Sequence, residues 1–462
     1  MIGLITIRIE FLRDDFGSDL RIRVKCSILG LVKIEEVEHF LSKFIDKPKA
    51  PNQVELEEEV ERKMQDSETG EIPEDLMIEI AARLPAKSVM RFRCISKFWS
   101  SLPLSTHFCN RFLTYQSQQP RFYMSLVHRL ENTKSLLLSS TPTTTCPCPC
   151  PSSSLEFHQD LTIGGGMVGN LLRVLHGFIC FTVKSEARIY NPSTRQLVIL
   201  PCIQESFVKG YPHYFSLYFI CHDPVSDQYK LLCVITALFS RQGLDEQEKE
   251  ELASVPETIS EHWVFVLEAG GSWKRVAEDF RTPHHPSRQQ VTMNNVLYYM
   301  AFTDSSQTCV LVSFDIRSEE LSMIKLPPPP GKRLALINYG GKVAVFDFSL
   351  LKENGLVDLW VVEHWRNKEW SRKTLFLQPC QMHLVTHCFF TAKGTTLKGQ
   401  VLLVPQYLIP PFYFLCYDFQ LNHLKKVEIS GIPDHWFTMD SFFKSFDVEF
   451  MDPTENVKYL ES

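Results

Sequence analysis

Two short motifs contain residue types that could hold a cofactor or a metal. Residues 164–169 fit G-x-G-x-x-G, which binds a dinucleotide when it joins a strand to a long helix. The apolar run HGFICF at 176–181 follows too soon for that helix, so a loop leading into a strand is favoured. Cys146, Cys148 and Cys150 could supply thiolates, but the alternating prolines keep the chain extended and the usual C-x2-C spacing is absent. An exposed low-complexity loop is favoured there.

A pair of histidines, His284-His285, lies between Pro283 and Pro286. No H-E-x-x-H pattern or carboxylate motif accompanies the pair, so we expect a surface loop rather than a zinc site. The sequence contains neither G-x-S-x-G nor a P-loop, and no catalytic cysteine motif stands out. These observations predict no catalytic residue, no cofactor and no metal.

The composition limits the class of protein. The 462 residues carry a net charge of −6, with 44% hydrophobic and 22% charged residues, as in ordinary globular proteins of roughly two to three domains. No basic stripe indicates nucleic-acid binding. The alternating start MIGLITIRIEFLRDDF is a poor signal peptide, and no apolar run of about 18 residues predicts a membrane span. The 14 cysteines lack a framework spacing, so we expect a cytoplasmic or nuclear protein.

Four regions of different composition must supply the elements that position any site. Residues 1–70 form a poorly defined extension that ends in the polar linker ELEEEVERKMQDSETGE. Residues 71–112 have helical periodicity, and residues 113–156 form a connecting segment with a Ser/Thr/Pro/Cys-rich loop. From 157 to 462, short apolar strands alternate with turn signals.

The strand region contains an internal repeat. In each copy, an apolar strand precedes a second strand, a polar turn and a further strand. The copies begin with HGFICF (176–181), NNVLYYM (294–300), GGKVAVF (340–346), KGQVLLVP (398–405) and, more weakly, YKLLCVI (229–235). A spacing of about 50 residues suits a blade of roughly four short strands, so the repeat predicts a kelch-like β-propeller whose number of blades stays open.

In three copies the second strand ends in an aromatic residue followed by Asn or Asp. Such an Asn or Asp can accept a hydrogen bond from the backbone two residues further on and start a tight turn. The preceding aromatic residue should point the opposite way, into the packed layer, because side chains alternate along a strand. The three pairs are Tyr190-Asn191, Phe314-Asp315 and Tyr417-Asp418.

Residues 71–102 predict two short helices with more apolar surface than they can cover. Pro73 suits the first helical position, Glu74 and Asp75 suit the positive end of the helix dipole, and Ser88 can cap the next helix. The apolar stripes are Leu76, Ile80 and Leu84 in the first helix, then Val89, Phe92, Ile95, Trp99 and Leu102. Because so small a unit cannot bury these side chains, either the rest of the chain or a partner must cover them.

The run IPEDLMIEIAARLPAKSVMRFRCISKFW (72–99) resembles an F-box of the plant type. It shares the opening Pro, the Leu-x3-Ile-x3-Leu-Pro spacing, the Lys-Ser-apolar start of the next helix and the Ser-Lys-x-Trp ending. Ile95-Ser96 stands where animal members more often have Val-Cys. The resemblance implies that this region docks on a Skp-type adaptor, which a cullin holds in turn. By matching positions, it implies adaptor contacts at Pro73, Leu76, Ile80, Leu84, Pro85, Val89, Ile95 and Trp99.

The strand region resembles the F-box-associated domain found behind plant F-boxes, through YNPSTRQLVILP (190–201), HDPVSDQYKLLCV (222–234) and DPTENVKYLES (452–462). The expected fold class is therefore α+β multidomain, with a small N-terminal three-helix F-box followed by an all-β kelch-like propeller. The two resemblances imply a non-catalytic substrate-recognition subunit of an SCF-type ubiquitin ligase. Its propeller would bind a target protein whose identity the sequence does not reveal.

Two other functions stay open at this point. A propeller scaffold could act without ubiquitin transfer, and a propeller enzyme of the kelch oxidase or glycan-processing kind could carry an active site on one face. Candidate target-binding elements are the insert at 240–256 and the aromatic residues Tyr211, Tyr214 and Phe215, because loops on a rigid scaffold often carry binding.

Overall fold

The computed structural model describes residues 5–13, 20–28, 74–84, 86–94, 96–116, 123–128, 135–140, 153–159, 170–183, 186–206, 208–210, 214–238, 258–276, 282–303, 308–327, 331–396, 399–407, 410–432, 446–451, 457–458 and 460. The chain divides into two units. The helical unit comprises Met1–Gln119, Asn191–Gln196 and Thr454–Tyr459, and the propeller unit comprises Pro120–Tyr190, Leu197–Pro453 and Leu460–Ser462.

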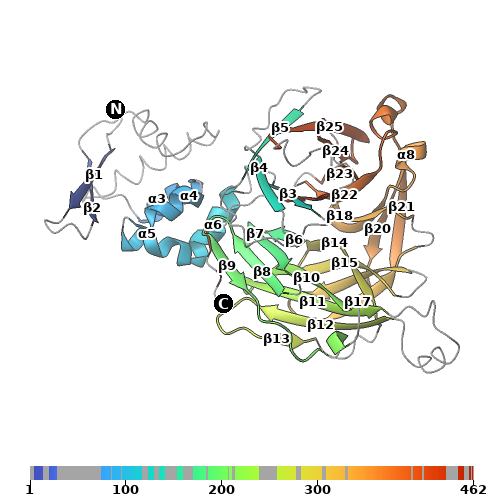
Figure 1. Ribbon diagram of the computed structural model, residues 1–462, viewed down its shortest axis with the longest axis horizontal. Helices are drawn as coiled ribbons and strands as arrows, with labels where there is room; N and C mark the ends of the chain where they lie inside the picture. Colours follow the sequence, from blue (N-terminus) through green and yellow to red (C-terminus); the bar gives the residue numbers. More distant parts are fainter. Residues whose placement is uncertain are drawn as a thin grey trace. The chain divides into compact units, whose positions relative to one another are not determined.

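The helical unit contains a hairpin and a group of short helices. Strands β1 (Ile5–Arg13) and β2 (Leu20–Ile28) pair antiparallel. The helices are α3 (Glu74–Arg83), α4 (Ala86–Phe92), α5 (Lys97–Ser101), the 3-10 helix η1 (Leu102–Leu104) and α6 (Thr106–Gln116) (Figure 1). The described part of the F-box region thus has four α-helices and a 3-10 turn, where the sequence predicts three helices.

Local chemistry explains where these helices begin. Glu74 and Asp75 occupy the first turn of α3, where negative charge is stabilised by the helix dipole. Ser96 caps α5, because its hydroxyl accepts a hydrogen bond from the Trp99 N–H at 3.4 Å. The helices share one core, which consists of Ala81, Ala82, Leu84, Ala86, Val89, Leu102, Phe108, Cys109, Phe112 and Val457. Val457 therefore completes a core that is otherwise built far upstream.

In the described residues, the propeller unit consists of β-strands and short helical turns. Four sheets have four strands each. The first contains β6 (Asn170–Leu175), β7 (Phe178–Val183), β8 (Glu186–Asn191) and β9 (Gln196–Ile199), and the second contains β10 (Tyr214–Asp223), β11 (Gln228–Leu238), β12 (Thr258–Val266) and β13 (Trp273–Arg275). The third contains β14 (His285–Met293), β15 (Val296–Phe302), β16 (Cys309–Asp315) and β17 (Leu321–Lys325), and the fourth contains β18 (Leu334–Tyr339), β19 (Lys342–Asp347), β20 (Leu356–His364) and β21 (Glu369–Phe376). The turns are η2 (Val208–Gly210), α8 (Leu351–Asn354) and η3 (Pro379–Leu384).

A fifth sheet has eight strands and joins the two ends of the propeller sequence. Its order is β22-β23-β24-β25-β5-β4-β3-β26. Its strands are β22 (Phe390–Thr395), β23 (Val401–Pro405), β24 (Tyr413–Asp418), β25 (His423–Ser430), β5 (Ser153–Gln159), β4 (Ser135–Ser140), β3 (Tyr123–His128) and β26 (Phe446–Met451). A parallel pairing of β25 with β5 links the halves, and β26 pairs antiparallel with β3.

The first strand of each four-stranded set lines the centre of the propeller unit. Contacts run from β6 to β10, β14, β18 and β22, then to β26 and back to β6, so the described inner strands form a closed ring. Figure 1 labels β6, β10, β14, β18 and β22 around the centre of the propeller unit. The sequence prediction of an all-β propeller is confirmed, with five sheets that present six inner strands.

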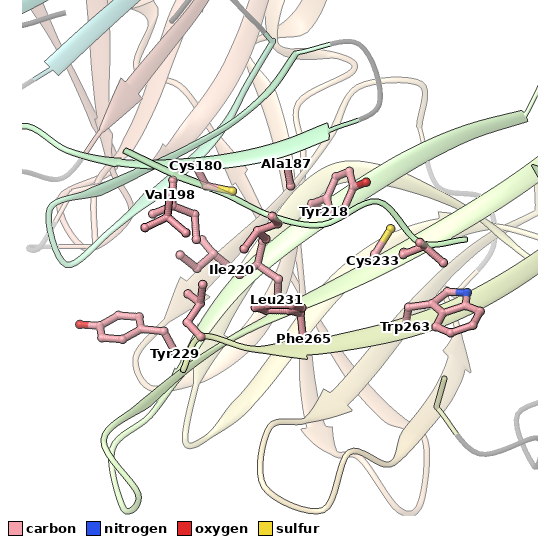
Figure 2. Close-up of a cluster of buried hydrophobic side chains, with 14 of the residues drawn as sticks. Cys180, Ala187, Val198, Tyr218, Ile220, Tyr229, Leu231, Cys233, Trp263 and Phe265 are labelled. Atoms are coloured by element: carbon pink, nitrogen blue, oxygen red, sulfur yellow. The ribbon is translucent and has the colours of Figure 1, made fainter. Parts of the chain in front are cut away.

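The apolar core lies in layers between neighbouring sheets. Figure 2 shows one layer, in which Cys180 and Ala187 from the first sheet meet Ile220, Leu231 and Phe265 from the next. Separate clusters fill the spaces between the second and third, third and fourth, and fourth and fifth sheets. A sheet that lies between two others therefore buries one apolar face against each neighbouring sheet.

The predicted Asx turns are confirmed. Asn191, Asp315 and Asp418 each accept a hydrogen bond at 2.9 Å from the N–H two residues further on, which belongs to Ser193, Arg317 and Gln420. The preceding aromatic side chains are buried as expected, with no more than 2% of Tyr190, Phe314 or Tyr417 exposed. The chain therefore reverses between the third and fourth strands by a turn that the sequence encodes locally.

The repeat found in the sequence covers only the outer strands of each set. Its copies correspond to β7–β9, β11–β13, β15–β17, β19–β21 and β23–β25. The inner strands were missed because several have little apolar alternation: β14 reads HPSRQQVTM and β22 reads FTAKGT.

The segment 113–156, interpreted from sequence as a connection, contains β3, β4 and the start of β5. These strands are short and interrupted by low-complexity sequence, which hides their pattern. The tracts at 146–150 and 164–169 lie outside the described residues.

Phe346 tests the layered core. Its side chain is fully buried and its ring lies 5.3 Å from Phe348 and 5.9 Å from Tyr417. We expect Phe346→Ala to destabilise the propeller unit by about 4 kcal/mol, because it removes a buried ring and leaves a cavity. Urea unfolding followed by tryptophan fluorescence measures the change. Phe376→Ala, at a ring that is 62% exposed, is the control and should shift stability by less than about 0.5 kcal/mol. Equal effects of the two substitutions would contradict the assignment of the core.

Candidate docking site on the helical unit

The structure separates the residues that the sequence assigned to adaptor binding into two groups. Leu76, Leu84 and Val89 are at most 7% exposed, and in this arrangement they hold the helices together. Ile80 and Trp99 are only partly buried. Pro73, Pro85 and Ile95 lie outside the described residues. The assignment of all eight as adaptor contacts stays a prediction.

The helical unit leaves several large apolar side chains incompletely covered. Three consecutive helices carry them. Besides Ile78, which packs against the helical core, six partly exposed residues are Met77 and Ile80 from α3, Met90 and Phe92 from α4, and Phe98 and Trp99 from α5. We call these six residues the apolar surface of the helical unit. A partner that covered them would gain the free energy of removing apolar area from water.

Aromatic contacts fix Trp99 within this surface. Its ring meets Phe92 edge-on with centroids 5.2 Å apart, and it meets Phe98 edge-on at 5.6 Å. These contacts restrain the ring, so Trp99 would lose little side-chain entropy when a partner covers it. A restrained, partly exposed tryptophan is a suitable anchor for a protein interface.

A buried carboxylate joins α3 to α6. Glu79 on α3 is 5% exposed and accepts hydrogen bonds from Arg83, Arg111 and the Tyr115 hydroxyl. The Arg83 Nη2 atom is 2.7 Å from Glu79 Oε1, and the Arg83 guanidinium also lies 4.8 Å from the centre of the Tyr115 ring. Arg111 and Tyr115 belong to α6, so the network fixes α6 against α3.

The network also determines the protonation of Glu79. Burial alone would raise the pKa of this carboxyl, but hydrogen bonds from Tyr115, Arg83 and Arg111 outweigh burial and hold the pKa below its usual value of 4.5. The sequence offered one part of this signal, the i, i+4 pair of Glu79 and Arg83. The other two partners come from α6 and could be placed only by the packing of the helices.

The prediction of a surface loop at His284-His285 is wrong for His284, whose side chain is fully buried in the propeller unit. Its Nε2 atom lies 2.8 Å from the Tyr299 hydroxyl and 3.2 Å from Nε2 of the buried His262. Burial lowers the pKa of His284 to about 4, so the imidazole is neutral at physiological pH. His284 leads directly into the inner strand β14, which sequence reasoning did not detect.

The structure describes only some of the candidate target-binding residues. The insert at 240–256 and Tyr211 lie outside the described residues. Phe215 is partly buried, and its ring meets His285 edge-on at 4.3 Å.

Among the residues that the structure describes, no helix is both long and apolar enough to cross a membrane. Within the same ranges, no three His, Cys, Asp or Glu side chains gather closely enough to hold a metal ion.

The fold and the helical unit together define a class of protein, an F-box followed by an all-β propeller. The F-box domain profile matches residues 70–111, and the profile of the F-box associated beta propeller domain matches residues 115–454. The second match covers most of the chain, so the chain belongs to the family of proteins with an F-box associated beta propeller domain.

Relatives in Arabidopsis thaliana extend this conclusion. The F-box/LRR-repeat protein At2g40920 is 44% identical over 409 residues, which cover 84% of this chain and 87% of the relative. F-box only protein 8 is 54% identical over 265 residues, covering 57% of this chain and 82% of the relative. The F-box/kelch-repeat protein At4g19930 is 36% identical over 411 residues, covering 84% and 90%. The chain is thus homologous to plant F-box proteins, as the sequence resemblance predicted.

The Glu79 network predicts a pH-dependent helical unit. Because the pKa of Glu79 is lower in the folded protein, its ionised form stabilises the unit above about pH 4.5, and this stabilisation is lost as the pH falls through the folded-state pKa. We expect Glu79→Gln to destabilise the unit by about 2 kcal/mol at pH 7 and to weaken this acid sensitivity. Hydrogen exchange of amides in α3 and α6 measures both effects.

Glu74→Gln is the matched control, since Glu74 is exposed on the same helix. It should cost less than about 1 kcal/mol, the size of a helix-dipole interaction. If Glu79→Gln left the exchange of α6 unchanged, the network would not be what fixes α6 against α3.

Proposed function

We propose that this protein is the substrate-recognition subunit of an SCF-type (Skp-cullin-F-box) ubiquitin ligase. Its F-box binds a Skp-type adaptor and through it a cullin, while its propeller binds a target protein that is then ubiquitinated. The apolar surface of the helical unit carries this proposal, because six large side chains stay partly exposed in a domain whose family docks on such adaptors. The cytoplasm or the nucleus is the location that this role requires.

In this proposal the chain contributes no catalytic group of its own. It holds the target near the ubiquitin-conjugating enzyme, and the rate rises because an encounter between separate molecules becomes a reaction within one complex. The rigid layered core of the propeller unit supports this role, since a target-binding surface is useful only if its position is fixed.

The exposure of the predicted adaptor-binding residues divides them into residues that would contact the adaptor and residues that would hold the helices in place. Ile80 and Trp99 are partly exposed and would contact the adaptor directly. Leu76, Leu84 and Val89 would act by keeping the helices in place unless docking rearranges them. The contact roles of Pro73, Pro85 and Ile95 rest on the family resemblance alone.

Charge on the same helices indicates the chemistry of the adaptor surface. Lys87 and Arg91 on α4 and Lys97 on α5 are exposed. An adaptor surface with an apolar centre and acidic residues at its border would complement them. Rim charges of this kind mainly raise the rate of association.

A pull-down with purified Skp-type adaptor tests the proposal. We expect wild-type protein to bind, and the double variant Ile80→Glu with Trp99→Ala to lose at least about 2 kcal/mol of binding, because it places a charge in the interface and removes its aromatic anchor. Both positions are partly exposed, so the thermal transition of the propeller unit should not change. Leu84 is unsuitable for this test, since its burial means that truncation would damage the helical core.

Glu74→Gln serves as the control on α3 and should bind normally. Failure of the wild-type chain to bind any Skp-type adaptor would overturn the proposal. Ubiquitin transfer needs its own test: a target that binds the propeller should accumulate in cells that express the Ile80→Glu, Trp99→Ala variant. A propeller scaffold without ubiquitin transfer would bind the adaptor but leave target levels unchanged.

A further inference from the structure

Five residues gather at one end of the fourth and fifth sheets of the propeller unit. Leu350, Phe389 and Tyr407 are exposed by 46%, 39% and 60%, although each is large and apolar or aromatic. Two cations accompany them: the Arg333 guanidinium lies 4.0 Å and the Lys352 ammonium 3.9 Å from the centre of the Phe389 ring. We call these five residues the Phe389 surface.

Strand register shows that the loops carrying this surface leave the sheets at corresponding ends. Leu334 begins β18 opposite Asp347, the last residue of β19, and Phe390 begins β22 opposite Pro405, the last residue of β23. The inner strands β18 and β22 are themselves in contact, as their positions in Figure 1 show. The surface therefore consists of loops that connect strands at one end of two adjacent sheets.

Hydrogen bonds hold these loops in place. Arg333 donates from Nη1 to the Phe390 carbonyl at 3.0 Å, and its N–H donates to the Ser349 hydroxyl at 2.9 Å. The Gln406 N–H donates to the Phe389 carbonyl at 2.7 Å, which joins the segment that carries Tyr407 to the segment that carries Phe389. These loops are therefore held in place before a ligand binds, so binding would cost little conformational entropy of the loops.

In the part of the chain that the structure describes, the two cations form no ion pair with an acid. Within the described residues, neither Arg333 nor Lys352 lies within 4.0 Å of a carboxylate oxygen, the distance that defines an ion pair. Two other cations that lie over aromatic rings do have such partners. Arg372 lies over Trp360 and binds Asp358 at 2.7 Å, and Lys426 lies over Tyr413 with Glu428 at 3.4 Å.

The nearby carboxylate of Asp347 is hydrogen-bonded to backbone N–H groups. Asp347, at the end of β19, accepts hydrogen bonds from the backbone N–H groups of Gly331 at 2.7 Å and Ser349 at 3.0 Å. Its carboxylate oxygens therefore shape the loop before β18, and within the described residues they form no ion pair with Arg333 or Lys352. The two cations can still pair with an external anion.

We propose that the Phe389 surface binds an acidic segment of the target protein that also carries an apolar or aromatic side chain. Carboxylates of the segment pair with Arg333 and Lys352, which cation–π attraction holds against the Phe389 ring. The apolar side chain covers Tyr407 and Leu350. This inference rests on the proposed role in target recognition and names the chemistry of what is recognised.

Selection of displayed random peptides against the full-length chain tests the proposal. We expect enriched peptides to combine Asp or Glu with Phe, Leu or Tyr. The affinity of one such peptide, labelled with fluorescein and measured by anisotropy, should fall about tenfold in the variant Arg333→Gln, Lys352→Gln. It should also fall when salt is raised from about 0.1 M to about 0.5 M.

Lys373→Gln is the matched control, because Lys373 also faces an aromatic ring, that of Tyr339, at the opposite end of β18. This variant should bind the peptide like wild type. Enrichment of neutral or basic peptides, recovery of no peptide, or equal affinity for wild type and the Arg333, Lys352 variant would each overturn the proposal. Unfolding in urea confirms that the variants keep the propeller fold.

Adaptor binding separates this inference from the proposed function. The Arg333, Lys352 variant should bind a Skp-type adaptor normally, because the substituted residues belong to the propeller unit. Loss of peptide binding with adaptor binding intact supports the assignment of the surface. A wild-type chain that binds acidic peptides but no adaptor would overturn the ligase role and leave the surface standing.

Discussion

The propeller unit depends on the strand pairing that closes its ring of sheets, β26 with β3 and β25 with β5. Each layer of apolar side chains lies between two sheets, so every sheet needs neighbours on both faces. A ring satisfies this condition for all sheets only if it closes. The antiparallel pairing of β26 with β3 and the parallel pairing of β25 with β5 close it. The same pairings cover strand edges that would otherwise be free to bind other chains.

Within the ring, local chemistry sets the path of the chain. The Asx turns at Asn191, Asp315 and Asp418 reverse the backbone, and four residues later Arg195, Glu319 and Asn422 adopt positive φ angles of 60°, 60° and 47°. The buried aromatic residue before each turn fixes which face of the strand points inward. One short sequence pattern thus sets both the turn and the register of the sheet.

These turns explain why much of the fold was predictable from sequence and why some of it was not. The outer strands carry strong alternation and turn residues, so they appeared as a repeat. The inner strand β14, with its Pro, Arg and Gln residues, and the strands β3 to β5 have no such local signal. The helical stripe located Ile80 and Trp99, but their exposure, the Glu79 network and the burial of His284 arise from contacts between segments far apart in sequence. The Phe389 surface likewise exists only after four loops have been brought together.

Closure by β26 also affects how the protein folds during its synthesis on the ribosome. Strand β3 is synthesised long before its partner β26, so the ring of sheets cannot close until the last strand has been made. The helical unit waits as well, since Val457 fills a core whose other members lie between Ala81 and Phe112. A nascent chain interrupted before residue 446 would lack both the closing strand and this valine. Truncated products would therefore carry an incomplete core in each unit and expose apolar surface that cellular quality control recognises.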